Sequence, residues 1–231
     1  MDLSVVTQVS LVSLAFFAGL ISSIAGSGGI LTLPALLWAG LPPLNALATN
    51  KVQSSIGTLS SAWNFFRNGH IDIKPLLPVL LMGFVGSVIG TLSVQQLDSE
   101  ILLTLIPFLL IAIALYFLLM PKISAADSQP KISQRWFACT AGLGMGFYGG
   151  FFGPAMGSIF PFLLVWLVAR NLVTATAETK LMILVVNGTS AVIFIAGGHV
   201  LWGLAIAMSI AQMIGARLGS NLVMKRGSGF V

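Results

Sequence analysis

Charged side chains are scarce in this chain: only 7% of its 231 residues are Asp, Glu, Lys or Arg, whereas 57% are hydrophobic. Soluble domains carry about 25% charged residues. A soluble fold of this length could not hide so much apolar surface in one core. The composition therefore excludes an ordinary soluble protein and predicts a chain whose solvent is lipid.

Residues that bind metals or carry out catalysis are equally rare. The chain has one cysteine, Cys139, and two histidines, His70 and His199. One cysteine cannot form a disulfide within the chain, and two isolated histidines make a poor metal site. No arrangement of nucleophile, base and orienting acid is visible. The net charge of +5 is scattered, which argues against nucleic acid as a partner. We expect no enzyme activity, no metal and no cofactor.

Long apolar runs recur along the chain, and about 20 apolar residues suffice for a membrane-spanning helix. The sequence predicts an all-α, polytopic bundle with seven spans, at residues 5–25, 45–66, 75–97, 101–120, 136–156, 174–196 and 199–223. Two apolar stretches, 30–38 and 157–169, follow glycine-rich breaks and are shorter. We expect broken or re-entrant segments there, enclosed by protein.

An internal repeat relates the two halves of the chain. A shift of 129 positions aligns residues that rarely coincide by chance: Lys51 with Lys180, His70 with His199, Gly86 with Gly215 and Gly90 with Gly219. We expect a first repeat in residues 1–120, a polar connector in 121–135 and a second repeat in 136–231. A complete 4+4 design would have one further helix after the second copy, so a truncated form is expected, and the alternative is a genuine seven-helix variant. Four spans per copy would make the repeat parallel, and five would make it inverted.

Lysine and arginine in short loops mark the cytoplasmic side of a membrane protein. With seven spans and a cytoplasmic N-terminus, five of these residues lie inside: Arg67, Lys74, Lys122, Lys131 and Arg135. Three lie outside: Arg170, Lys225 and Arg226. The excess is small, and it predicts a cytoplasmic N-terminus.

Ionisable residues inside spans are costly and often functional. Four are present here: Lys51, Glu178, Lys180 and Arg217. Lys51 comes early in its helix, where the helix dipole repels a cation, so an anion held between them would explain it. The alternative is a lysine that reaches the membrane interface. The repeat places Lys180 in the same register, which favours an anion site.

The predicted substrate site also includes small and polar residues near the lysines and the first break: Ser27, Gly28, Gly29, Thr49, Asn50, Asn187 and Ser190. Glu178 is a candidate for proton coupling, or else a structural partner of Lys180. The glycine-rich breaks could bring backbone N–H groups to a ligand. Their alternative role is close packing between helices.

Two groups of motifs resemble the TauE/SafE family of sulfite exporters, in particular its YfcA-like branch. The first half has Ser22-Ser23-Ile24-Ala25-Gly26-Ser27-Gly28-Gly29 and Ala48-Thr49-Asn50-Lys51. The second half has Gly149-Gly150-Phe151-Phe152-Gly153-Pro154 and Gly215-Ala216-Arg217-Leu218-Gly219. The resemblance implies a multi-pass transporter of the bacterial inner membrane that carries sulfite, sulfonates or related organosulfur anions.

The function expected from the sequence is therefore secondary transport by alternating access. Lys51 and Lys180 would hold a small anion while the two halves rock around it, and no nucleotide-binding motif is visible as an energy source. The alternatives are an anion channel and a non-transporting assembly subunit of the membrane. The expected partners are the anion and the lipid bilayer. The sequence leaves open the exact substrate, the transport direction, the coupling ion and whether the chain forms a homo-oligomer.

Overall fold

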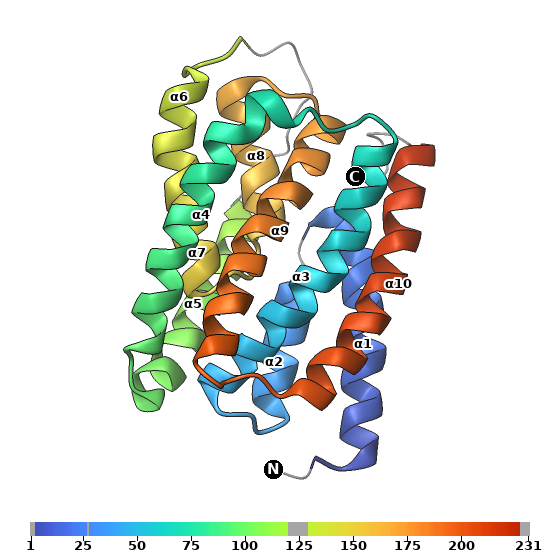
Figure 1. Cartoon of the computed structure of the whole chain (residues 1–231), viewed down its shortest axis with the longest axis vertical. Coiled ribbons are helices and arrows are strands. Elements are labelled where there is room, and N and C mark those ends of the chain that lie inside the picture. Colours follow the sequence, from blue (N-terminus) through green and yellow to red (C-terminus); the bar gives the residue numbers. More distant parts are fainter. Residues whose placement is uncertain (1–2, 27, 120–128, 227–231) are drawn as a thin grey trace.

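The computed structural model describes residues 3–26, 28–119 and 129–226, which form a helical bundle (Figure 1). Its elements are α1 (Val5–Ala25), α2 (Gly29–Trp38), α3 (Pro43–Arg67), α4 (Ile73–Gln95), α5 (Ser99–Leu119), α6 (Gln134–Phe137), the π-helix η1 (Ala138–Gly142), α7 (Leu143–Phe151), α8 (Met156–Val168), α9 (Leu172–Ala196) and α10 (Trp202–Arg226). No strand occurs within these ranges, so the all-α prediction is confirmed.

Four of the described helices, α1, α4, α5 and α9, are long and apolar enough to cross a membrane. Two others, α3 and α10, have 25 residues each, a length of about 37 Å at 1.5 Å per residue. Both helices are less apolar, because each buries polar side chains inside the bundle. The two short apolar segments expected from the sequence are the separate helices α2 and α8.

Glycine and proline set the two breaks in the bundle. Gly26 adopts φ +83°, a left-handed conformation that ends α1, and donates its N–H to the carbonyl of Ser22. In the second half the helix ends at Phe151, ahead of Gly153 at φ +103° and Pro154. The predicted span over 136–156 is therefore wrong at its C-terminal end. That segment also contains the π-helix η1, which the sequence pattern did not indicate.

The two copies run in opposite directions. In Figure 1, α1 and α3 rise from the end of the bundle that holds the N-terminus, whereas α7 and α9, their counterparts, descend toward that end. The segment α1–α5 contains an odd number of elements, because α2 turns back after the break. Of the two arrangements left open by the sequence, the structure has the inverted one.

The copies are also interleaved. α1 packs along α10, and α7 packs along α4, so each copy's first helix lies on a long helix of the other copy. Gly215 lies against the backbone of Phe16 in α1, and its repeat partner Gly86 lies against the backbone of Leu143 in α7. Each of the two glycines thus lies against the first helix of the other copy, and neither half of the sequence forms a separate lobe.

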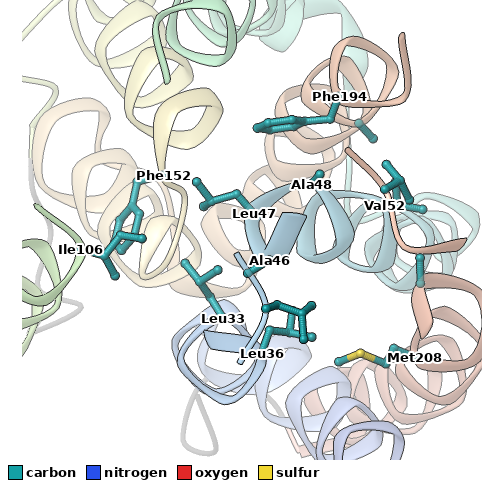
Figure 2. Close-up of a cluster of buried hydrophobic side chains, with 14 of the residues drawn as sticks. Leu33, Leu36, Ala46, Leu47, Ala48, Val52, Ile106, Phe152, Phe194 and Met208 are labelled. Carbon is teal, nitrogen blue, oxygen red and sulfur yellow. The ribbon is translucent and has the colours of Figure 1, made fainter. Parts of the chain in front are cut away.

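A large cluster of apolar side chains holds α2 inside the protein. Figure 2 shows Leu33 and Leu36 of α2 among residues from α3, α5, α9 and α10. Leu33, Leu36 and Phe194 are fully buried. One face of the ten-residue helix α2 is therefore buried in protein, through Thr32, Leu33 and Leu36, and contact with protein is what makes a short membrane-depth segment stable.

The positive charges gather at one end of the bundle, the upper end in Figure 1. The loops and helix termini at this end hold Arg67, Lys74, Lys131, Arg135, Arg170 and Lys225. In the described part of the chain, the opposite end holds Asp98 and Glu100 and neither lysine nor arginine. The sequence-based division of these charges between two sides is wrong, because α2 reverses the direction of the helices from α3 to α7, and α8 restores it for α9 and α10.

We predict that substituting Gly215 by Ala destabilises the fold by about 1–3 kcal/mol, since the new Cβ would overlap the α1 backbone and push two helices apart. Gly188 in α9 has open space at the same position, so Gly188→Ala should be neutral or stabilising by about 0.5–1 kcal/mol. Thermal unfolding of both variants in detergent tests this. Equal stability of the two variants would contradict the close packing of α1 on α10.

We predict that the charged end faces the cytoplasm, because the positive-inside rule applies to all the described loops of that end together. The N-terminus then faces the opposite compartment. A reporter fused to the N-terminus that is active only outside the cytoplasm should be active, and the same reporter inserted in the loop before α4 should be silent. The reverse pattern would refute this orientation.

Candidate functional site

The two breaks meet in the middle of the protein and enclose a small cavity. Gly26 and Gly157 lie so close that a Cβ on either would overlap the other's backbone. Beside them is a cavity of about 30 Å³. Its polar lining comes from α1, α3, α9 and α10: Ser22, Asn50, Lys51, Ser54, Thr58, Asn187 and Gln212. The cavity has room for about one water molecule.

The lining of the cavity is electropositive. The first residues of α2 and α8, Gly29 and Met156, lie at its wall, and a helix start presents free N–H groups and a partial positive charge. Lys51 adds a buried amine, which is a hydrogen-bond donor and a cation when protonated. No carboxylate belongs to the described lining. The cavity therefore favours an anionic or strongly hydrogen-bond-accepting ligand.

Each buried lysine contacts the C-terminal end of a broken helix from the other copy. The Lys51 amine donates a hydrogen bond to the carbonyl of Gly149, in the last turn of α7, and lies 3.4 Å from Oδ1 of Asn187. The Lys180 amine donates to the carbonyl of Ser22, in the last turn of α1. Helix C-termini carry a partial negative charge and free carbonyls, so they stabilise a nearby cation.

This arrangement changes the physical explanation for the lysines. Lys51 lies in the third turn of α3, beyond the free N–H groups at that helix's start. Its charge is offset by α7, and an anion is not required to keep it buried. What makes Lys51 a ligand-binding candidate is its position at the cavity wall. Lys180 is equally buried but does not line that cavity.

Hydrogen bonds fix the polar side chains beside Lys51. Asn50 donates to the hydroxyl of Thr32 in α2 at 2.6 Å, and Ser54 lies 3.4 Å from Oδ1 of Asn50. These bonds connect α3 to α2, the helix whose start borders the cavity. A movement of α2 would therefore move both the helix start and the side chains that face it.

The predicted site residues divide into two groups. Gly29, Asn50, Lys51 and Asn187 come together at the cavity. Four others lie elsewhere: Gly28 precedes α2, Thr49 accepts the N–H of Leu201 at 3.2 Å, Ser190 bonds to Thr91 at 2.7 Å, and Lys180 bonds to Ser22. Ser27 lies outside the described residues. Arg217, which was not assigned to the site, has its side chain on the exposed face of α10.

Glu178 forms an ion pair with Arg170, not with Lys180. Its Oε1 lies 3.3 Å from Nε of Arg170, and the Glu178 side chain is only 2% exposed. The second carboxylate oxygen, Oε2, is buried and has no hydrogen-bond partner in the described part of the structure. The repeat counterpart is Thr49, whose hydroxyl is bonded. The two copies therefore differ in charge at this position.

Sequence reasoning missed several cavity residues, including Ser22, Thr58 and Gln212. One of them had a detectable signal: shifting the predicted Asn187 by 129 positions gives Thr58, so both members of a repeat pair face the cavity. Gln212 corresponds to Gly83 in the other copy, and no pattern in the sequence distinguishes it. Its place follows from the packing of α10 on α3.

Comparison with known families identifies the chain. A family described as Sulfite exporter TauE/SafE matches residues 11–230. The chain belongs to this family. It is a multi-pass membrane protein of bacterial type, in agreement with the resemblance carried by the glycine breaks and the Ala48–Lys51 motif.

Individual relatives cover nearly the whole chain. A protein named "Probable membrane transporter protein YfcA" from Escherichia coli K12 is 45% identical over 92% of this chain and 79% of its own length. A "Probable membrane transporter protein" from Haemophilus influenzae is 39% identical over 98% of this chain and 89% of its own. One named ORF9 from Sinorhizobium is 41% identical, covering 93% and 82%. No solved structure gives a significant match.

Proposed function

We propose that this protein is a secondary transporter that moves small anions across the bacterial inner membrane by alternating access, with sulfite, sulfonates or related organosulfur anions as substrates. The family and its relatives support membrane transport. The choice of an anion rests on one observation: the central cavity combines Lys51 with two helix starts and contains no described carboxylate. Substrate sites between broken helices near the membrane midplane are common among transporters.

The binding step would compete with existing hydrogen bonds. Lys51 donates to Gly149 and Asn187, and an anion would give its third N–H a stronger, charge-assisted partner. A sulfonate is larger than the water-sized space present. Binding would therefore require α2 or α8 to move outward. This coupling of site occupancy to helix movement favours a carrier over an open channel.

We also propose that Glu178 couples transport to protons. Its buried Oε2 lacks a described partner, so a proton there would remove a buried charge without breaking a described hydrogen bond. Arg170, which is partly exposed at the charged end, competes with the proton for the same carboxylate. Protonation would weaken this ion pair and release α9 from the loop that carries Arg170.

We predict that Lys51→Gln lowers anion uptake by about tenfold or more, because it removes about 1.4 kcal/mol or more of binding or barrier energy. Uptake of radiolabelled sulfite and of a short sulfonate into proteoliposomes measures this. Lys180→Gln is the matched control, since it removes a buried lysine that does not line the cavity. Equal uptake by wild type and Lys51→Gln, at equal amounts of folded protein, would refute the site.

We predict that Glu178→Gln abolishes accumulation driven by a pH gradient while leaving exchange of anion for anion. The amide keeps the shape of the side chain but cannot gain or lose a proton in this range. Glu100→Gln, at an exposed position in the first turn of α5, is the control and should behave as wild type. If Glu178→Gln still concentrates the anion when only a pH gradient is imposed, Glu178 is not the coupling residue.

A further inference from the structure

A small apolar cluster closes the charged end of the bundle. Its four buried members are Phe65 at the end of α3, Ile71 in the following loop, Ala177 in α9 and Val223 in α10. We call this group the charged-end plug. It lies between the cavity and the loops that carry the positive charges, and it joins helices from both copies.

The repeat reproduces this cluster at the other end, residue for residue. A shift of 129 positions converts its members into Phe194, Val200, Ala48 and Val94. All four are buried and belong to one cluster. We call them the opposite-end plug. A histidine packs edge-on against the phenylalanine of each, His70 on Phe65 at 6.1 Å and His199 on Phe194 at 6.5 Å between ring centres.

The two plugs differ in what supports them. The opposite-end plug is part of the largest apolar cluster, which also contains Leu33 and Leu36 of α2 and Leu102 and Ile106 of α5 (Figure 2). Among the described residues, three partly buried apolar side chains pack against the charged-end plug, those of Ile24, Leu181 and Met224.

Polar residues connect the cavity to the charged-end plug along the α3–α10 interface. Gln53 donates to Gln212, a cavity residue, at 2.6 Å. Farther along, Asn64 donates to Ser220 at 2.7 Å and to Asn221 at 2.8 Å. Oε1 of Gln53 is buried without a hydrogen-bond partner in the described residues, which is where water or a polar solute would be stabilised.

The corresponding interface in the other copy is less polar beside the cavity. The positions of Gln53 and Gln212 are occupied there by Met182 and Gly83, and the Met182 side chain packs directly on the glycine. The α3–α10 side therefore offers a hydrogen-bonded route out of the cavity that the α4–α9 side lacks at this level.

We propose that the two plugs are the two gates of the transport pathway, and that the charged-end gate opens along the α3–α10 interface. This inference rests on the proposed transport function. Alternating access requires one closed gate at a time, and inverted repeats supply the same gate at each end.

The test places one cysteine in the cavity and measures its exposure from each side. Ser54→Cys, combined with Cys139→Ser to remove the only native thiol, gives the reporter. A membrane-impermeant thiol reagent is applied to vesicles of either orientation. Adding Phe65→Ala should raise the labelling rate from the charged end by about tenfold. The matched Phe194→Ala should raise labelling from the opposite end.

A second matched pair protects the test against misfolding. Ile71 and Val200 lie in loops, so Ile71→Ala and Val200→Ala shorten the plugs without altering a helix. They should shift labelling toward the same ends as the phenylalanine variants. Each pair consists of one variant in each plug. If both variants of a pair change labelling from the same end, or if neither variant changes it, the plugs are not the gates.

The labelling assay tests the gates and the uptake assay tests the proposed function, and either can give a negative result without the other. Labelling needs no knowledge of the substrate, so a plug-dependent pattern in a protein that moves no sulfur anion would refute only the proposed function. Anion uptake that depends on Lys51, together with labelling that ignores the plugs, would refute only the gates.

Discussion

The fold depends on how two buried ammonium groups are kept stable inside a hydrocarbon-like interior. Each belongs to a long helix of one copy and is bonded to a carbonyl in the last turn of a broken helix of the other, Lys51 to Gly149 and Lys180 to Ser22. A helix must end at that depth for the carbonyls of its last turn to be within reach of a lysine side chain. Each helix break therefore provides the carbonyl that stabilises a buried lysine. The repeat contains two such pairs of a break and a lysine.

This exchange of partners makes the two copies inseparable. The sequence alone led us to expect that its two halves rock as rigid bodies. Because α1 packs on α10 and α7 packs on α4, such halves cannot move as separate bodies. Any movement must instead separate sets of helices drawn from both copies. The short helices α2 and α8 are the parts best placed to move, since their starts border the cavity and each follows a break.

Departures from symmetry carry the functional asymmetry. Lys51 reaches the cavity wall and Lys180 does not, and Glu178 replaces Thr49. A perfectly symmetric molecule would be equally stable open to either side. Each of these differences gives one side a charge or a proton-binding group that the other lacks, so they would set the preferred resting state and the coupling.

Composition and periodicity determined the membrane environment, the all-helical fold, most helix limits and the short segments α2 and α8, because these follow from local hydrophobicity and from glycine and proline. The 129-residue shift also identified the paired lysines. The direction of each helix, the end at which the charges gather and the ion pair of Glu178 with Arg170 depended on tertiary structure. So did the ligand-facing role of Lys51 and the cavity place of Gln212, since both result from contacts between segments more than 90 residues apart, which no local pattern encodes.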